Sequence, residues 1–428
     1  MEYTVQPAKA VKGEMVVPGD KSISHRSIML GSLAEGQTRV TGFLRGEDNL
    51  ATLNAFRAMG IDITDDGTTL RISGKGLRGL SEPTDVLDCG NSGTSMRLMA
   101  GLLAGQSFFS VLTGDQYLRR RPMKRVIEPL ARMGGTIFGR SGGDRAPLAI
   151  VGRPLAGISH HSAVASAQVK SALMLAGLYA EGETTITEPH LSRDHSERMF
   201  RYFGADVASF TGGVTVRGGR ELQGRDIIVP GDISSAAFFI VAALIVPGSE
   251  LLIRGVGVNP TRTGILDILT AMGGDIQLLD CRDLSGEPVA DILVRASRLR
   301  GVEIGGDVVP RAIDEFPVIC VAAALADGQT TLRDAHELRV KETDRITAMA
   351  KNLCRAGVAI AETPDGMVIE GAGRIDGCRA ESFGDHRIAM SMLVAGLAAS
   401  GEVTVDDVEC IGTSFPDFIP LLQKVANS

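Results

Sequence analysis

Basic side chains gather at a turn near the amino terminus. Residues Val17–Asp20 form a Val-Pro-Gly-Asp turn, which is followed by Lys21, Ser22 and Arg26. Pro-Gly interrupts regular structure, and Asp20 or Ser22 can cap a helix that begins here. Because the first turn of a helix attracts anions, this pattern predicts an anion site. Solvated basic residues on a capped helix are the alternative interpretation.

Three more polar segments of the first half precede apolar stretches. Gly93 lies in the turn Asn91–Ser95, where the missing Cβ lets backbone N–H groups approach an anion. The run Arg119–Arg125 holds five positive charges in seven residues, and arginine can bind a phosphate or carboxylate through two parallel hydrogen bonds. Ser166–Lys170 opens another apolar stretch. Helix capping or a solvated charged surface remains the alternative for each segment.

The second half combines acidic and basic residues at similar positions. Asp314 precedes an apolar stretch, Lys341–Arg345 reads Lys-Glu-Thr-Asp-Arg, and Gly384–Arg387 opens the last apolar helix. Asp314 could be a simple N-cap or a carboxylate facing an inter-domain cleft. Glu342 and Arg345 are three residues apart, so a surface ion pair is an alternative to a functional role.

Together these cations exceed what one small anion needs. They are Lys21, Arg26, Arg121, Lys341, Arg345 and Arg387. With only Asp314 and Glu342 added, the site stays strongly cationic, which suits two anionic substrates and leaves two carboxylates for proton transfer. We find no metal-ligand cluster, phosphate-binding P-loop or nucleophile elbow, and expect neither a metal nor a cofactor.

Composition excludes several other classes. The chain of 428 residues carries a net charge of −7 and only 4% aromatic residues, which argues against a nucleic-acid surface. Its six cysteines are scattered, which argues against disulfides and zinc and fits a reducing cytoplasm. We expect no signal peptide and no membrane span, because the longest apolar run, Ala236 to Val246, is too short.

A repeated pattern must position these residues. Six stretches share a polar or Gly-rich start, an apolar helix, a glycine and a β-rich run. They are 21–36, 91–105, 166–182, 234–248, 314–328 and 386–401. The turn at Val17 recurs at Val229–Asp232, so we predict two α/β domains of three units each, 18–232 and 1–17 plus 233–428, hinged at the two Pro-Gly-Asp crossovers.

The motifs jointly resemble the 5-enolpyruvylshikimate-3-phosphate (EPSP) synthase family, from about Val17 to Pro416. The matching segments are 18–26, 90–94, 121–122, 166–168, 341–345 and 385–387. The resemblance implies a two-domain inside-out α/β barrel of six βαβαββ units, which closes on its substrates. It also implies transfer of the enolpyruvyl group of phosphoenolpyruvate to the 5-hydroxyl of shikimate 3-phosphate, with release of phosphate, in the shikimate pathway to aromatic amino acids. We expect a cytoplasmic monomer.

The resemblance further implies a role for each matching residue. The shikimate 3-phosphate ligands would be Lys21, Ser22, Arg26, Ser166, Ala167, Gln168, Asp314 and Lys341. The phosphoenolpyruvate ligands would be Lys21, Gly93, Arg121, Gln168, Arg345 and Arg387. Asp314 would take the 5-hydroxyl proton and Glu342 would protonate the methylene carbon, and Lys21 and His386 could assist.

Several positions resemble the second, often glyphosate-tolerant class of this family. These are Leu98, Arg193–His195, Glu337 and Thr413–Pro416. Gly93 is kept where some tolerant members have alanine, so tolerance to this inhibitor stays open. The alternative function is UDP-N-acetylglucosamine enolpyruvyl transfer, but the loop Thr113 to Arg121 lacks that family's reactive cysteine. A non-catalytic binding protein and an RNA-end-processing relative are the other rivals.

Overall fold

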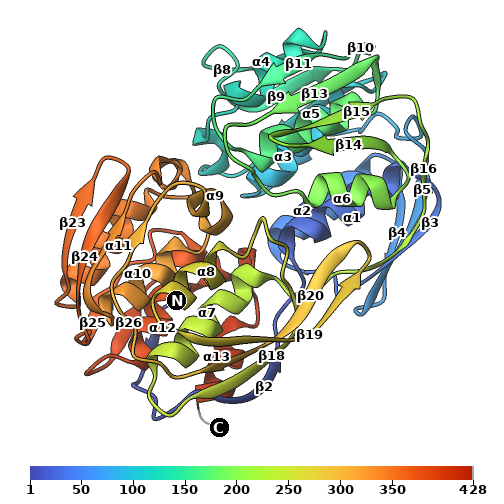
Figure 1. Ribbon diagram of the computed structural model, residues 1–428. Coiled ribbons are helices and arrows are strands. Elements are labelled where there is room, and N and C mark those ends of the chain that lie inside the picture. The colour runs from blue at the N-terminus through green and yellow to red at the C-terminus, as the bar shows by residue number, and fades with distance from the viewer. Residues whose placement is uncertain (427–428) are drawn as a thin grey trace. The chain divides into compact units, whose positions relative to one another are not determined.

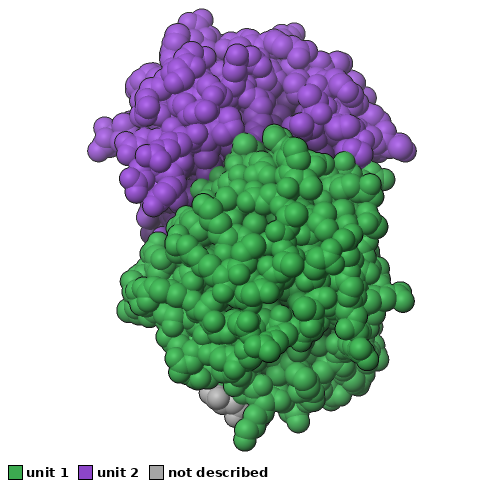
Figure 2. Space-filling view, turned by 90° about the vertical axis from the view of Figure 1, so that its left-hand side faces the viewer, with its two compact units in different colours: residues 1–18, 230–282, 288–428 green, residues 19–229, 283–287 purple. Residues whose placement is uncertain are grey.

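The computed structural model describes residues 1–426 and divides the chain into two compact units (Figures 1 and 2). Unit 2 consists of residues 19–229 and 283–287. Unit 1 consists of residues 1–18, 230–282, and 288 to the end of the described chain. Each unit has its own core of buried apolar side chains. Two of the boundaries fall inside the two Val-Pro-Gly-Asp turns.

The three main sheets of unit 2 share one strand order. In each, the first strand is parallel to the second, and the next two strands are antiparallel to their neighbours. They are β17 (Asp226–Ile228)–β3 (Ala34–Thr41)–β5 (Thr69–Lys75)–β4 (Asp62–Asp65), β6 (Leu87–Asp88)–β7 (Phe109–Thr113)–β9 (Arg145–Val151)–β8 (Thr136–Arg140), and β11 (Ser159–His161)–β13 (Glu183–Thr187)–β15 (Gly213–Arg217)–β14 (Asp206–Phe210). The short strands are β16 (Leu222–Gln223), which pairs with β3, and β10 (Leu155–Ala156), which pairs with β12 (Ala180–Glu181).

Unit 1 repeats this order twice and shortens it once. The two full sheets are β2 (Lys12–Val16)–β18 (Glu250–Gly257)–β20 (Glu287–Arg295)–β19 (Asp275–Leu284) and β21 (Glu303–Ile304)–β22 (Asp327–Leu332)–β24 (Gly366–Ala372)–β23 (Ala359–Thr363). The short sheet is β25 (Cys378–Ala380)–β26 (Val403–Val405)–β1 (Tyr3–Val5). The predicted α/β fold of six repeat units is confirmed. In the last sheet, β1 from the amino terminus takes the third place, and a fourth strand is absent from the described residues.

In each unit, the first strand of one sheet is the last element before the chain crosses to the other unit. Strand β2 pairs in parallel with β18, although the chain after β2 enters the first helix of unit 2. Strand β17 pairs in parallel with β3, although the chain after β17 returns to unit 1. The two turns therefore connect a strand of one unit to a helix of the other, which explains why the same four residues recur.

Helices alternate between buried and half-buried types. The buried helices are α1 (Lys21–Leu33), α3 (Gly93–Ala104) and α5 (Ala167–Gly177) in unit 2, and α7 (Ile233–Ile245), α10 (Phe316–Ala324) and α12 (His386–Leu397) in unit 1. The others are α2 (Glu47–Ala58), α4 (Lys124–Arg132), α6 (His195–Tyr202), α8 (Gly264–Ala271), α9 (Val308–Ala312), α11 (Arg345–Arg355), α13 (Phe418–Ala426), and the 3-10 turns η1 (Leu118–Arg120), η2 (His336–Val340) and η3 (Val408–Thr413).

Small residues let the buried helices touch. A Cβ at Gly101 of α3 would lie 2.0 Å from the Ala172 carbonyl oxygen of α5, so only glycine permits this helix–helix contact. Such helices are apolar on every side because they are covered on every side. The sheets around them stay open: none of those in residues 1–426 closes on itself. The inside-out arrangement that the resemblance implied is therefore confirmed: in the described residues, separate open sheets, and no closed barrel of strands, surround a helical interior.

Candidate functional site: the starts of the buried helices

The start of α1 is built as the sequence predicts. Asp20 caps the helix, since its Oδ1 accepts from the Ile23 N–H at 2.9 Å. Lys21 forms an ion pair with Asp48, and its backbone carbonyl accepts from Asn49 Nδ2 at 3.1 Å. The side chain of Lys21 is 19% exposed, so it can still reach a ligand.

Arg26 is a buried cation held by neutral groups. Its Nε donates to Ser196 Oγ and its Nη2 to Ser171 Oγ, both at 2.7 Å, and its Nη1 donates to the Ser22 carbonyl at 2.9 Å. Burial lowers the pKa of Arg26 to about 10. A guanidinium with uncharged acceptors gains more from an added anion than one already paired with a carboxylate. Arg26 is thus suited to bind a phosphate.

Two arginines lie against the start of α3. Ser92 caps this helix by accepting from the Ser95 N–H at 3.0 Å. A Cβ at Gly93 would stand 2.9 Å from an Nη1 atom of both Arg97 and Arg121. The structure therefore brings together the predicted residues Gly93 and Arg121, which come from different motifs. Arg121 is also oriented by Asn91, whose Oδ1 accepts from its Nη2 at 2.7 Å.

The start of α5 joins this group. Ser166 is the N-cap, and its own N–H donates to Glu188 Oε1 at 3.0 Å. The Gln168 side chain donates to Thr94 Oγ1 at 3.0 Å and accepts from Arg97 Nη1. Ala167 is the first residue of the helix. The predicted residues of α5 are therefore joined to α3 through Arg97.

Arg97 is a functional candidate that the sequence predictions missed. It is 5% exposed and contacts Gln168, the Pro122 carbonyl and the position of Gly93. The sequence does indicate this position, because Arg97 lies one helical turn after Gly93 and therefore on the same face of the helix.

Arg345 occupies the centre of the corresponding group in unit 1. It is 2% exposed, and it donates to Asp385 Oδ2 and Glu342 Oε2 at 2.7 Å each, and to Asp314 Oδ1 at 3.3 Å. Burial opposes its charged form, but the three carboxylates outweigh burial and raise the pKa of Arg345. The ion pair considered for Glu342 and Arg345 does form, but it is not a surface pair, because Arg345 is buried.

Asp314 is placed as a carboxylate among cations. Its Oδ1 lies 3.2 Å from Lys341 Nζ, and its backbone carbonyl accepts from Arg387 Nη1 at 3.0 Å. The N-cap residue of α10 is Glu315, so the simple capping role considered for Asp314 is not observed. The structure thus brings together Asp314, Lys341 and Arg387, again from three different motifs.

Asp344 and Asp385 perform the capping in unit 1. Asp344 Oδ1 accepts from the Thr347 N–H at 3.1 Å, and Asp385 Oδ1 accepts from the Arg387 N–H at 2.8 Å. Asp385 is completely buried and also pairs with Arg345, a role that the sequence predictions missed. His386, the first residue of α12, is buried and shares a 3.2 Å hydrogen bond with Thr413.

The two groups differ in charge balance. In unit 2 the cations Lys21, Arg26, Arg97 and Arg121 lie at the starts of α1 and α3, where Asp48 pairs with Lys21, and the start of α5 adds Lys170 with Glu188 and Glu197. In unit 1 the cations Lys341, Arg345 and Arg387 are matched by Asp314, Glu342 and Asp385, with Glu315 3.9 Å from Arg387. The strongly cationic site expected from the motifs included Asp314 and Glu342 but not Asp385 and Glu315, and with these two the group in unit 1 is close to balanced in charge.

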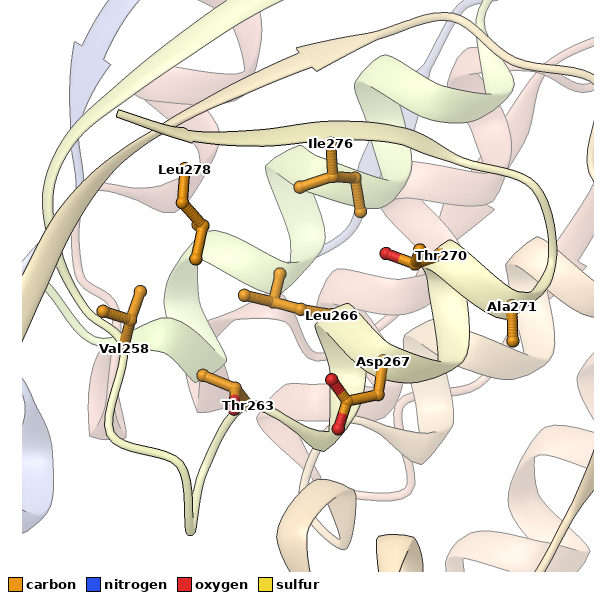
Figure 3. A pocket seen from close by; sticks show the side chains of 8 residues that line it. All are labelled: Val258, Thr263, Leu266, Asp267, Thr270, Ala271, Ile276 and Leu278. Atoms are coloured by element: carbon orange, nitrogen blue, oxygen red, sulfur yellow. The ribbon is translucent and has the colours of Figure 1, made fainter. Parts of the chain in front are cut away.

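A separate apolar pocket lies on unit 1, beside α8 and β19 (Figure 3). Its volume is about 610 Å³, and its lining includes Leu266, Ile276 and Leu278. Asp267 is the charged residue of the lining, and it pairs with Arg311 at 2.7 Å. The lining contains none of the predicted substrate ligands, so this pocket is not the candidate site. Among residues 1–426, no helix is both long and apolar enough to span a membrane.

Comparison with solved structures shows which class has this fold. The enolpyruvyl transferase NikO from Streptomyces tendae is similar with a TM-score of 0.78 over 99% of this chain and 96% of its own, at 18% identity. The fold is therefore that of the enolpyruvyl transferases. The EPSP synthase from Acinetobacter baumannii is more similar, with a TM-score of 0.89 and 49% identity over 99% of this chain and 98% of its own.

Sequence comparison narrows this class to one family. The family model of EPSP synthase (3-phosphoshikimate 1-carboxyvinyltransferase) matches residues 5–422. The 3-phosphoshikimate 1-carboxyvinyltransferases of Geotalea uraniireducens and Geobacter metallireducens are 78% and 77% identical, each over 99% of both chains. The chain belongs to the EPSP synthase family.

Proposed function

We propose that this chain transfers the enolpyruvyl group of phosphoenolpyruvate to the 5-hydroxyl of shikimate 3-phosphate and releases phosphate. The observation that carries the proposal is the family match over residues 5–422, which includes every predicted ligand. The charge division between the two groups of helix starts supports it. UDP-N-acetylglucosamine enolpyruvyl transfer is not favoured, because the family and the relatives are named for 3-phosphoshikimate.

Shikimate 3-phosphate would bind mainly at unit 2. Arg26 and Lys21 supply cations for its phosphate, and Ser22 and Ser166 supply hydroxyl groups beside them. The starts of α1 and α5 add backbone N–H groups that favour an anion. From unit 1, Lys341 and Asp314 would contact the ring hydroxyls.

Phosphoenolpyruvate would bind where arginines predominate. In unit 2, Arg121 lies at Gly93 and Gln168 donates to the neighbouring Thr94, and Arg345 and Arg387 of unit 1 would be the further ligands. Arginine suits both the carboxylate and the phosphate of this substrate, because its planar fork donates two parallel hydrogen bonds. The same cations would stabilise the phosphate as it leaves.

The carboxylates of unit 1 would move the protons. Asp314 accepts hydrogen bonds from Lys341 and Arg345, so it is present as a carboxylate that can take the 5-hydroxyl proton. Glu342, which would enter this step protonated, would deliver a proton to C3 of phosphoenolpyruvate, which makes C2 electrophilic, and it would take a proton back from C3 in the last step. The 5-oxygen then bonds to C2 and gives a tetrahedral intermediate. Loss of phosphate from C2 and of one proton from C3 restores the double bond.

An acceptor assay tests this function. The chain is given phosphoenolpyruvate with either shikimate 3-phosphate or UDP-N-acetylglucosamine, and phosphate release is followed. We expect release with shikimate 3-phosphate and none above background with the other acceptor. No release with shikimate 3-phosphate would reject the proposal, and release with only UDP-N-acetylglucosamine would establish the alternative.

We also propose that the units act as two domains hinged at the Val-Pro-Gly-Asp turns. The unit boundaries at Pro18/Gly19 and Val229/Pro230 support this. A cytoplasmic monomer is the form we propose, since both substrates are small anions. Gel filtration with light scattering tests the monomer, and a dimer mass would reject it.

A further inference from the structure

The first turn of α6 connects three elements through buried polar contacts. Its consecutive residues His195, Ser196 and Glu197 are 2%, 1% and 4% exposed. The Ser196 hydroxyl accepts from Arg26 Nε of α1, and Glu197 Oε1 lies 2.8 Å from Lys170 Nζ of α5. Both partner helices carry predicted ligands of shikimate 3-phosphate, so α6 supports this subsite from behind.

Lys170 extends the support to the N-cap of α5. Besides Glu197, it lies 3.1 Å from Glu188, whose Oε1 accepts from the Ser166 N–H. Burial opposes the charge of Lys170, but the two glutamates outweigh burial and raise its pKa. A displacement of Glu197 would therefore leave a buried ammonium incompletely paired, which is costly.

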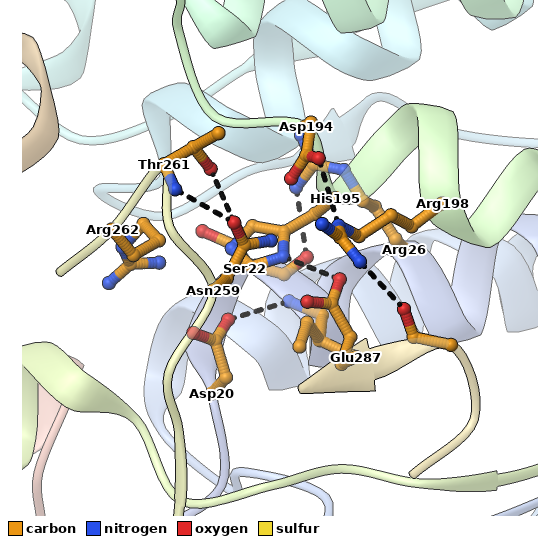
Figure 4. A network of polar contacts seen from close by, with 12 residues as sticks. Asp20, Ser22, Arg26, Asp194, His195, Arg198, Asn259, Thr261, Arg262 and Glu287 are labelled. Carbon is orange, nitrogen blue, oxygen red and sulfur yellow. Dashed lines mark hydrogen bonds and ion pairs between the residues drawn. The ribbon is translucent and has the colours of Figure 1, made fainter. Parts of the chain in front are cut away.

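The third partner of this turn comes from a distant part of the chain. Glu287 begins β20, and its Oε1 lies 2.8 Å from His195 Nδ1, with side-chain exposures of 3% and 2% (Figure 4). An ionised carboxylate only accepts hydrogen bonds, so His195 Nδ1 carries the proton. Residues 283–287 belong to unit 2, although the strands β19 and β20 on either side run in a sheet of unit 1.

The hairpin tip is held to α6 at further points. Arg198 donates from Nη1 to the Gly286 carbonyl at 3.1 Å, and its Nε donates to Asp194 at 2.8 Å (Figure 4). The Ser285 hydroxyl accepts from the Ile228 N–H at 3.0 Å. The tip is therefore a docked element of unit 2, entered and left by strands of unit 1.

We propose that Glu287 is a positioning residue, which holds the first turn of α6 so that Ser196 and Glu197 keep Arg26 and the start of α5 arranged for shikimate 3-phosphate. The inference rests on the proposed function. Because coupling between binding and docking is reciprocal, shikimate 3-phosphate also strengthens docking of the hairpin tip. The β19–β20 hairpin is a third chain connection between the units, beside the two turns. How firmly its tip is docked therefore depends on whether shikimate 3-phosphate is bound.

Glu287→Ala tests the positioning role, with Glu287→Gln as the conservative variant. We expect the Kd of shikimate 3-phosphate, from calorimetric titration, to rise about tenfold or more in Glu287→Ala, as for loss of a charged buried hydrogen bond. The KM for phosphoenolpyruvate should change less than about twofold, and Glu287→Gln should restore most of the affinity since its amide oxygen still accepts from His195. Glu250→Ala is the matched control, because Glu250 forms an exposed pair with Arg295 on the same sheet.

If Glu287→Ala does not fold, Ser196→Ala and amide hydrogen exchange test the same positioning role. Ser196→Ala should weaken shikimate 3-phosphate alone, and the ligand should slow amide exchange in residues 283–287 of the unaltered chain but less in this variant. Unchanged affinity in Glu287→Ala or Ser196→Ala, equal loss for both substrates, or no slowing at the tip would overturn the inference. If the unaltered chain does not bind shikimate 3-phosphate, the proposed function fails as well.

Discussion

Arg26 and Arg345 are both buried arginines near a helix start, and their surroundings are opposite. Arg26 lies in the second turn of the buried helix α1 and Arg345 begins the half-buried helix α11, and both helices have an aspartate N-cap. The acceptors around Arg26 are two serine hydroxyls and a backbone carbonyl, whereas Arg345 contacts three carboxylates. A buried arginine near a helix start therefore remains suited to bind an added anion in unit 2 and orders a group of carboxylates in unit 1.

The pKa directions follow this difference. Burial lowers the pKa of Arg26 to about 10, and carboxylates overcome burial to raise that of Arg345. A buried arginine whose hydrogen-bond acceptors are uncharged gains by binding phosphate, while a balanced group holds its carboxylates in fixed positions. This difference supports the proposal that unit 2 mainly binds anions and that unit 1 transfers protons.

Replacing the proposed base should have the largest effect. Asp314→Asn keeps the side-chain shape but cannot take a proton, so kcat should fall by about 10²–10⁴. The Kd of shikimate 3-phosphate should change less than about fivefold, since most of its ligands lie in unit 2. Steady-state kinetics and calorimetric titration measure the two effects. A large loss of affinity with near-normal kcat would exclude the base role.

Removing the buried cation of unit 2 should mainly affect binding. Arg26→Gln deletes the charge, and the Kd of shikimate 3-phosphate should rise about 10- to 100-fold, as for loss of a charged hydrogen bond. Titration with shikimate 3-phosphate alone measures this. Arg374→Gln, at an exposed pair with Asp376, is the control and should leave the Kd unchanged. An equal Kd of shikimate 3-phosphate in both variants would show that Arg26 does not bind this substrate.

Adding one methyl group at Gly93 should have a moderate effect. The new Cβ would lie 2.9 Å from the guanidinium groups of Arg97 and Arg121, which must shift. Because both guanidinium groups are the ends of flexible side chains, the KM for phosphoenolpyruvate should rise only about three- to tenfold. The KM for shikimate 3-phosphate serves as the internal control and should stay nearly constant. Equal changes in both constants would show that Gly93 does not separate the two subsites.

The smallest effect concerns stability at low pH. His25 is fully buried, and burial, with Lys21 and Arg26, lowers its pKa well below 6.5. Unfolded His25 binds a proton near pH 6.5 and folded His25 does not, so unfolding becomes easier as pH falls below about 6.5. The loss is at most about 1.4 kcal/mol per pH unit.

Thermal unfolding of His25→Gln measures this dependence. Relative to the unaltered chain, the variant should lose less Tm between pH 7 and pH 5.5, and His161→Gln, at an exposed position, should behave like the unaltered chain. The same pH dependence in all three proteins would show that unit 2 does not exclude a proton from His25.

Local sequence features predicted much of the structure. The caps Asp20, Ser92, Ser166, Asp344 and Asp385 are residues that favour helix starts, and each lies at the start that its motif indicated. The repeated glycine-ended helices correctly indicated six α/β units. Local pattern succeeds here because capping and helix termination depend on a few neighbouring residues.

Contacts between distant segments could not be predicted in this way. The pairing of β17 with β3 and of β2 with β18 joins residues that are 187 and 238 positions apart in the sequence. The balance of charge around Arg345 depends on Asp385, 40 residues away, and the partner of His195 is 92 residues away. Motifs therefore predicted the candidate ligands and left their electrostatic partners undetermined.

The most direct test measures Arg26→Gln and Asp314→Asn side by side, each by the Kd of shikimate 3-phosphate and by single-turnover rate at saturating substrates. The account predicts a crossed result: Arg26→Gln loses affinity and keeps most of the rate once saturated, while Asp314→Asn keeps most of its affinity and loses the rate. Parallel losses of affinity and rate in both variants would contradict the division of binding and proton transfer between the two units.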